Sequence, residues 1–320
     1  MLSKLDVSQL NESVQKIKSE IGKVIVGQHA MIDLLIAAML AEGHALIEGV
    51  PGVAKTLTAK LIAKTIDVPF SRIQFTPDLM PSDVIGTSVF NPQTATFNFK
   101  YGPVFSNIVL IDEINRSPAK TQAALFEVME ERQITYDGIT HKLPEPFMVL
   151  ATQNPVEHEG VYRLPEAQLD RFLFKIVVNY PSLDEEVNIL EYANQGITQH
   201  FADVVSTVLN GNDILSCRQL VAGVHAEAKV MRYIAELVNE TRNNKSIYLG
   251  GSPRASVSIL KSAKAIAAMS GRDFITPDDV VNMLQPVLCH RIILTPEREM
   301  EGGTADDVIK EITKKVEVPR

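Results

Sequence analysis

The feature that most constrains this chain is a glycine-rich turn between an apolar run and an amphipathic helical pattern. The turn reads GVPGVAKT over residues 49–56 and follows the apolar run His44 to Glu48. Such a turn, when it leads into a helix N-terminus, points several backbone N–H groups inward, where they bind phosphate oxygens together with the helix dipole. The sequence therefore predicts a phosphate loop over residues 49–56, and predicts as nucleotide-binding residues Gly49, Val50, Pro51, Gly52, Val53, Ala54, Lys55, Thr56 and Leu57.

One residue departs from the general pattern G-x-x-x-x-G-K-[ST], because Ala54 stands where the last glycine is expected. A methyl group fits there only when the backbone φ is negative, so we predict a negative φ for Ala54. Lys55 would reach the β- and γ-phosphates, and the Thr56 hydroxyl would bind Mg²⁺. The alternative is a glycine-rich turn that is merely tight.

A second motif ends the apolar run Ile108 to Ile111 with two carboxylates, Asp112 and Glu113. This is the Walker B arrangement, in which a buried strand delivers the first acid to the magnesium shell. The second acid polarises the water that attacks the γ-phosphate. Apolar strands that end in acids are common by chance, but one that follows a phosphate loop predicts a site for nucleotide hydrolysis.

Short apolar runs alternate with helical patterns through the first half of the chain, which is typical of a parallel sheet covered by helices. We therefore predict an α/β fold, with a five-stranded parallel sheet flanked by helices. The predicted strands are His44 to Glu48, Phe70 to Phe75, Ile108 to Ile111, Phe147 to Ala151 and Phe174 to Val178.

After Tyr180-Pro181 no apolar run of useful strand length appears, and helix starts recur instead. Each predicted start pairs a capping residue with a proline or an acid. The starts are Ser117-Pro118 in the first half, then Ser182 with Glu185, Ser252-Pro253 and Thr276-Pro277-Asp278-Asp279. We predict two domains, an α/β domain over residues 1–180 and a helical domain over residues 181–320, with an apolar stripe at Ile259, Ala263 and Ile266 in its central helix.

Two insertions interrupt the α/β domain, near residues 91–101 and 132–143. The first reads NPQTATFNFKY, from Asn91 to Tyr101. The second, from Arg132 to Leu143, places Asp137-Gly138 between alternating residues, which predicts a β-hairpin with a tight turn. The aromatic side chains of these segments either grip a polypeptide or simply pack on the hairpins.

Composition bounds the remaining classes of protein. The chain has 320 residues, of which 45% are hydrophobic, and a formal charge of −8, which disfavours nonspecific binding to nucleic acid. The longest apolar run, Leu34 to Ala41, is too short to cross a bilayer, and no apolar stretch follows a basic start, so we expect no membrane insertion and a cytoplasmic protein. Cys217 and Cys289 lack a CxxC pattern and are expected to be buried thiols.

Together these motifs resemble the AAA+ ATPases, and within them the MoxR family, over nearly the whole chain. The resemblance rests on GVPGVAKT (49–56), FTPDLMPSDVIG (75–86), IDEINRSP (111–118), ATQNP (151–155), LPEAQLDRF (164–172) and GSPRAS (251–256). The family's phosphate loop commonly carries alanine where Ala54 stands. The resemblance implies a P-loop domain with a C-terminal helical lid, and it implies ATP and Mg²⁺ as ligands, with Thr56 and Asp112 at the metal.

The resemblance also implies roles for single residues in the nucleotide site. Val26 and Gly27, with Gln28, resemble the segment that flanks the adenine. Asn154 resembles sensor 1, whose amide would hold the attacking water together with Glu113. From spacing alone, Asn154 could instead be a turn residue before a proline.

Four arginines are candidates for cations that act at the nucleotide site or at a subunit boundary. Arg171 resembles the arginine finger, which completes the site of the neighbouring subunit; without the family it would be a surface ion pair. Arg254 resembles sensor 2 of the lid, and could touch the γ-phosphate within its own subunit or across the boundary. Arg116 and Arg163 are further candidates for interface cations.

The leading hypothesis is a Mg²⁺-dependent ATP hydrolase that forms a ring, expected to be a hexamer, and remodels or activates protein complexes. The resemblance implies protein clients, among them proteins with von Willebrand factor A domains, and implies that the insertions face the pore of the ring. A second hypothesis is a nucleic-acid remodeller, which the acidic charge and the few cations on the insertions, Lys100, Arg132 and Lys142, disfavour. A third is an assembly switch that binds ATP with negligible turnover, which a complete water-activating set argues against.

Overall fold

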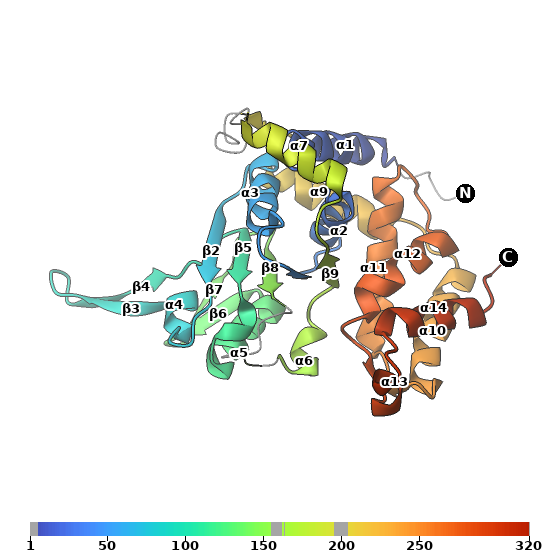
Figure 1. Ribbon diagram of the computed structural model, residues 1–320. Helices are drawn as coiled ribbons and strands as arrows, with labels where there is room; N and C mark the ends of the chain where they lie inside the picture. The colour runs from blue at the N-terminus through green and yellow to red at the C-terminus, as the bar shows by residue number, and fades with distance from the viewer. Residues whose placement is uncertain (1–5, 155–161, 163, 195–203, 320) are drawn as a thin grey trace.

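Figure 1 shows the computed structural model of the chain, in which a sheet wrapped by helices packs beside a second group of helices. The structure describes residues 6–154, 162, 164–194 and 204–319. Within these ranges every helix is too short or too polar to span a bilayer.

The central sheet has five strands, all parallel, in the order β2-β5-β8-β1-β9. The strands are β1 (Ala45–Gly49), β2 (Phe70–Gln74), β5 (Ile108–Asp112), β8 (Met148–Gln153) and β9 (Phe174–Val178). Every residue of β5 is buried, as expected for a parallel strand whose two faces are both covered. The predicted α/β fold is confirmed, and each strand lies within two residues of the apolar run that predicted it.

Alternate side chains of the strands pack into two separate cores, one on each face of the sheet. Ile108 and Leu110 of β5 join a first core with α1 (Ser8–Gly22), α2 (His29–Leu40) and α3 (Lys55–Thr65). Val109 and Ile111 join a second core with α5 (Ala119–Glu131). This division follows from the two-residue period of a strand, which sends neighbouring side chains to opposite faces.

The second half of the chain is mainly helical. Its helices within the described residues are α7 (Leu183–Asn194), α9 (Gly211–Gly223), α10 (Ala228–Asn243), α11 (Pro253–Met269), α12 (Pro277–Leu288), α13 (Pro296–Met300) and α14 (Ala305–Lys315). The expectation that strands are absent here is wrong at one place, where β10 (Ile247–Leu249) and β11 (Ile293–Leu294) form a short antiparallel pair. Strands of two or three residues are too short to show an alternating pattern in the sequence.

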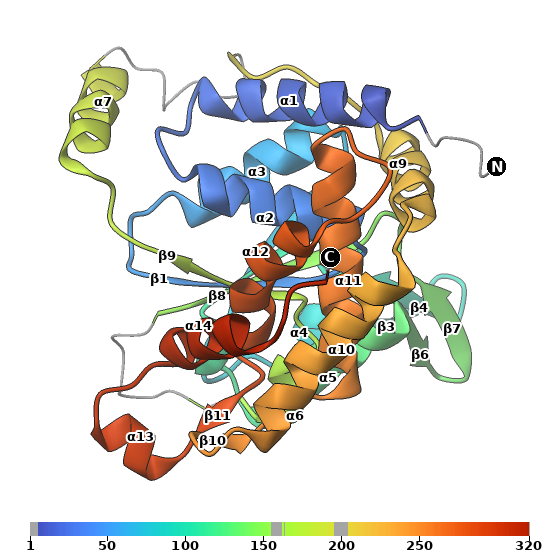
Figure 2. The same cartoon turned by 90° about the vertical axis from the view of Figure 1, so that its right-hand side faces the viewer.

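Helix α11 joins the two groups of helices. It packs against α2, which covers the sheet, against α1, which lies on α2 and α3, and against α9, α10 and α12 (Figure 2). Ile259 and Ala263 of the predicted stripe are fully buried, while Ile266 is partly buried against the same core. The first core therefore contains side chains both from the helices that flank the sheet and from the helices of the C-terminal half.

Two β-hairpins project from the α/β part on the side away from α11 (Figure 1). After α4 (Pro81–Ile85), strands β3 (Gly86–Asn91) and β4 (Thr96–Tyr101) form the first, and β6 (Gln133–Tyr136) and β7 (Ile139–Lys142) form the second. The first hairpin begins at Gly86, so the predicted insertion at 91–101 covered only its turn and second strand. In the second, Asp137 and Gly138 have φ of 48° and 77°, as a tight type I′ turn requires, which confirms the prediction.

Three of the four predicted helix starts are confirmed, since α7, α11 and α12 begin directly after Ser182, Ser252 and Thr276. The fourth is wrong by one residue, because α5 begins at Ala119 and Pro118 takes its cap position. Pro118 has an extended ψ of 150°, which excludes it from the helix, and the preceding serine is extended as residues before proline usually are.

Candidate active site

The predicted phosphate loop joins the carboxyl end of β1 to the start of α3. Gly49 lies against β9, where an added Cβ would stand 2.7 Å from the Val178 carbonyl oxygen, so the close approach of the two strands needs glycine. Gly52 has a φ of +87°, in the left-handed region that glycine adopts without strain. These two glycines shape the turn that leads into the helix.

The prediction of a negative φ for Ala54 is wrong. Ala54 has φ 58° and ψ 20°, and it occupies the cap position of α3. The turn into the helix imposes this left-handed conformation, which costs an L-residue roughly 1–2 kcal/mol. The half-buried methyl group packs against the first core, which offsets part of that cost.

Lys55 begins α3, and its side chain folds back over the loop, where Nζ donates to the Gly49 carbonyl oxygen at 2.6 Å. Burial lowers the pKa of the Lys55 ammonium, while the carboxylates of Asp112 and Glu113 act to raise it. The cation therefore lies within electrostatic reach of both acids of the second motif. Thr56 follows, half-buried, and its hydroxyl and the Asp112 carboxylate are oxygen donors of the kind that Mg²⁺ prefers.

Asp112 ends β5 and is 7% exposed. Its Oδ1 accepts a hydrogen bond from the Thr152 hydroxyl at 3.1 Å, and its Oδ2 pairs with Arg72 Nε at 2.5 Å. Thr152 lies on β8 and Arg72 on β2, the two strands that flank β5. Neighbouring strands thus fix the carboxylate at the carboxyl edge of the sheet.

Glu113 has a left-handed backbone, with φ 57°, and its N–H donates to the Thr152 hydroxyl at 3.0 Å. Its Oε2 accepts from Gln74 Nε2 at 2.7 Å and pairs with Arg116 Nε at 3.2 Å. Arg116, expected as an interface cation, therefore contacts Glu113 within its own subunit. The Glu113 carboxylate is held at the same edge as the phosphate loop.

Sequence reasoning missed Arg72, Gln74 and Thr152 as partners of the two acids. A signal was present, because Arg72 and Gln74 are polar residues two positions apart on a short strand. The parallel register places Gln74 beside Asp112, but that register depends on the strand order, which the sequence pattern did not supply.

The predicted adenine segment and sensor 1 lie at the same edge of the sheet. Asn154 follows β8 directly, and Gln28 Nε2 donates to the Asn179 carbonyl oxygen just beyond β9, at 3.3 Å. A cavity of about 890 Å³, whose lining includes Gln28, Asn179 and Gln285 of α12, opens here, and its size suits a small organic ligand. Val26 and Gly27 precede Gln28 directly. Arg163 lies outside the described residues.

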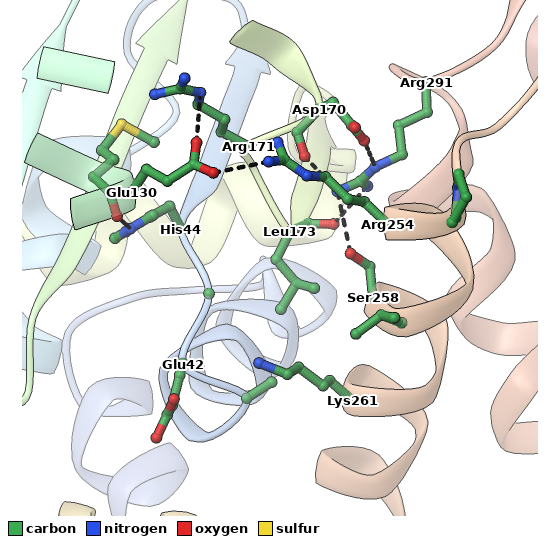
Figure 3. Close-up of a pocket in the computed structure, with 15 residues that line it drawn as sticks. Glu42, His44, Glu130, Asp170, Arg171, Leu173, Arg254, Ser258, Lys261 and Arg291 are labelled. Carbon is green, nitrogen blue, oxygen red and sulfur yellow. Dashed lines mark hydrogen bonds and ion pairs between the residues drawn. The ribbon is translucent and has the colours of Figure 1, made fainter. Parts of the chain in front are cut away.

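Arg171 and Arg254 lie at the other end of the strands, where the strands of the sheet begin. Arg171 follows α6 (Glu166–Leu169), and its Nε pairs with Glu130 Oε2 at 3.0 Å, while its guanidinium also donates to the Phe126 carbonyl oxygen. Arg254, the second residue of α11, pairs with Glu130 Oε1 at 2.8 Å. Figure 3 shows both arginines on this one carboxylate, beside a cavity of about 420 Å³.

The parallel pairing of β1 with β9 separates the arginines from the phosphate loop. The loop follows the last residue of β1, whereas Arg171 precedes the first residue of β9. A strand of five residues spans about 16 Å, at roughly 3.3 Å per residue. The predicted site residues therefore form two groups, one at each edge of the sheet.

The two cysteines are free and half-buried rather than fully buried. Burial raises the pKa of the Cys289 thiol to about 11 and also raises the pKa of Cys217. Both thiols are therefore protonated near neutral pH, which makes them poor nucleophiles.

Comparison with known protein families identifies two matching domains. Residues 44–174 match the ATPase family associated with various cellular activities (AAA), and residues 239–312 match the AAA lid domain. A crystal structure of an ATPase candidate from Cytophaga hutchinsonii is similar over 98% of this chain and 97% of its own, with a TM-score of 0.91 and 42% sequence identity.

Curated relatives are similar over almost the whole chain. The uncharacterized protein YeaC of Bacillus subtilis is 45% identical over 97% of this chain and 96% of its own. Chaperone MoxR1 of Mycobacterium tuberculosis is 42% identical over 94% of this chain and 81% of its own. Protein MoxR of Paracoccus denitrificans is 29% identical over 92% of each.

Proposed function

Because the chain belongs to the MoxR family of AAA+ ATPases, we propose that it binds ATP with Mg²⁺ at the phosphate loop and hydrolyses it in a ring of identical subunits, expected to be a hexamer. We further propose that the ring uses the energy to remodel or activate protein complexes. The observation that carries the proposal is the division of the site into two groups, one where the strands of the sheet end and one where they begin. A closed ring can bring the first group of one subunit against the second group of its neighbour.

Within one subunit, the loop and the two acids carry the binding and the chemistry. The backbone N–H groups of residues 49–56 and the Lys55 ammonium would bind the β- and γ-phosphates. Thr56 and Asp112 would hold Mg²⁺, which supplies positive charge to the phosphate oxygens when bound. Glu113 would orient and deprotonate the attacking water together with Asn154, and Val26 and Gly27 would flank the adenine.

Between subunits, Arg171 and Arg254 would complete the site of the neighbour. A guanidinium placed beside the γ-phosphate stabilises the negative charge of the transition state, and supplying it from a second subunit makes turnover depend on assembly. The pairing of both arginines with Glu130 supports their joint action, since the carboxylate holds the two guanidinium groups together. We propose that Arg254 acts across the boundary rather than within its own subunit.

The hairpins support proteins, rather than nucleic acids, as clients. Phe97 at the end of the first hairpin is 71% exposed, and Ile139 of the second is 61% exposed. Arg132, one of three cations on these segments, pairs with Glu42 at 3.9 Å. This pairing argues against a basic stripe on the hairpins that would bind nucleic acid. We include von Willebrand factor A domain proteins among the expected clients, and MoxR1 of M. tuberculosis is itself described as a chaperone.

The proposal is tested by the rate of ATP hydrolysis per subunit, measured against protein concentration with and without Mg²⁺, beside the mass of the assembly under the same conditions. We expect the rate per subunit to rise as the ring forms and to vanish without Mg²⁺. A protein that binds ATP, forms the ring and still hydrolyses none would overturn hydrolysis in favour of an assembly switch. A monomer that hydrolyses ATP at full rate would overturn the shared site.

A further inference from the structure

A third arginine, Arg291, is buried where the C-terminal helices meet the segment that carries Arg171. It follows α12, and its side chain is only 2% exposed. A charged side chain is rarely buried unless it is paired and fully hydrogen-bonded, because water solvates the charge far better than the protein interior does. Burial lowers the pKa of Arg291, and the hydrogen bond and charge of Asp170 act to raise it.

The contacts of Arg291 account for all of its hydrogen-bond donors. Nε donates to Asp170 Oδ1 at 2.7 Å, and the two terminal nitrogens donate to the carbonyl oxygens of Asp170, Phe172 and Leu173, at 3.1, 2.6 and 3.1 Å. Further bonds go to the Val287 carbonyl and the Ser258 hydroxyl. Arg291 therefore binds the backbone on both sides of Arg171.

The same segment is bound from α11. The hydroxyl of Ser252, the cap residue of α11, donates to Asp170 Oδ2 at 3.0 Å, so one oxygen of Asp170 contacts the cap of α11 and the other contacts Arg291. Ser258, which Arg291 also contacts, lies on the same helix as Arg254, one turn further along (Figure 3). These bonds join the residues on either side of Arg171 to the helix that carries Arg254.

We propose that Arg291 is a positioning residue that fixes the segment around Arg171 onto α11 and α12, so that Arg171 and Arg254 enter the neighbouring site as one rigid unit. This inference rests on the proposed function, in which both arginines act on the neighbour's ATP. Lysine cannot replace Arg291, because an ammonium has three donors and lacks the planar fork that reaches several carbonyl groups at once.

The first test compares Arg291→Lys with Arg232→Lys, a matched change at an exposed arginine whose partner is Glu236 on the same helix. We expect Arg291→Lys to lower turnover in the ring roughly tenfold or more, since an arginine finger is worth far more than that. The affinity of the same subunit for a fluorescent ATP analogue should stay within about twofold of wild type, because its phosphate loop is at the other edge. Arg232→Lys should change neither quantity. Wild-type turnover in Arg291→Lys rings overturns the proposal.

The second test distinguishes positioning from a general loss of structure. Arg291→Lys subunits keep an intact phosphate loop, and Lys55→Ala subunits keep an intact Arg171, so mixed rings contain boundaries at which both halves are sound. In a ring whose subunits bind head to tail, random mixing in equal amounts should give about one quarter of the boundaries an intact loop beside an intact finger. Turnover should then return to about one quarter of the wild-type value. If Arg291→Lys subunits do not fold, Asp170→Asn, which weakens the same link from the other side, takes their place with the same expectation.

The control for the mixture is Arg171→Ala with Lys55→Ala. If that control regains hydrolysis and the Arg291→Lys mixture does not, the positioning role is wrong and the proposed function stands. If assembled rings of the control also stay inactive, the shared site itself is wrong, and the positioning role falls with it.

Discussion

Arg171 and Arg254 bind opposite oxygens of one carboxylate, that of Glu130, at 3.0 and 2.8 Å. Arg171 precedes the edge strand β9, and Arg254 is the second residue of α11. Glu130 and the two arginines lie where the strands of the sheet begin, whereas the phosphate loop lies where the strands end. Hydrolysis of ATP at a boundary between subunits, as proposed, would explain why two cations of this kind are held together away from the phosphate loop of their own chain.

Replacement of Lys55 by alanine should greatly weaken the binding of ATP. The ammonium lies over the loop, and its loss removes a charge-assisted contact to the phosphates, so we expect affinity to fall about 100-fold, or about 3 kcal/mol. Lys60→Ala, at an exposed position on the same helix, is the matched control and should bind normally. A titration with a fluorescent ATP analogue measures both, and equal affinities for the two variants would contradict the phosphate-loop assignment.

Replacement of Glu113 by glutamine should separate binding from turnover. The amide keeps the shape of the side chain but cannot accept a proton from the attacking water, so turnover should fall about 100-fold or more while ATP affinity is kept. Glu127→Gln, at an exposed position on α5, should leave the rate unchanged. Near wild-type turnover in Glu113→Gln rings would remove Glu113 as the base.

Replacement of Ala54 by glycine should stabilise the fold. Glycine adopts the left-handed conformation of this position without the cost that an L-residue carries, so we expect the free energy of unfolding to rise by about 1 kcal/mol. Ala123→Gly, at an exposed position inside α5, should lower it by about 1 kcal/mol. Urea denaturation of both variants measures the difference. A loss of stability in Ala54→Gly comparable to that in Ala123→Gly would argue against the left-handed backbone.

Stability should fall in mild acid because His44 is buried as the neutral imidazole. Its Nδ1 accepts from the Val149 N–H at 2.9 Å and its Nε2 donates to the Met129 carbonyl oxygen at 3.1 Å. Burial lowers the pKa of His44 to about 4, whereas the unfolded chain titrates near the ordinary value of 6.5. The unfolded state therefore binds the extra proton first. The contribution of His44 is complete above pH 6.5 and is lost as the pH falls toward 4, by about 3 kcal/mol.

Urea denaturation between pH 7 and pH 4.5 checks this dependence. His44→Gln should flatten the profile, while His29→Gln, at an exposed position, should not. His290 is also buried, and burial lowers its pKa, so part of the slope should remain in His44→Gln. A variant profile parallel to that of the wild type would show that His44 does not titrate with unfolding.

The sequence predicted those features that depend on neighbouring residues along the chain. The five strands, the loop at 49–56 and the hairpin turn at Asp137-Gly138 each follow from a local pattern of apolar, glycine and turn residues. The conformation of Ala54 did not follow, because the turn into α3 overrides the preference of the residue itself. Pro118 was misplaced by one position for a similar reason, since its extended backbone makes it the cap of α5 rather than the first residue of the helix.

Contacts between distant segments were not predictable from these patterns. The partners of Asp112, namely Arg72 and Thr152, come from the two strands beside β5, so they depend on the strand order. The joint binding of Arg171 and Arg254 to Glu130 needs three separate elements to meet at one point. The resemblance to a family supplied candidate roles for the two arginines, but only the fold placed them together.

Mixing Arg171→Ala subunits with Lys55→Ala subunits tests whether each ATP site is shared between two subunits, as we propose. Each variant alone should be inactive, because Arg171→Ala lacks the arginine finger and Lys55→Ala binds ATP too weakly. In rings mixed at random in equal amounts, about one quarter of the boundaries combine an intact loop with an intact finger, so turnover should return to about that fraction of wild type. Mixed rings of verified assembly that stay as inactive as the separate variants would contradict a shared site.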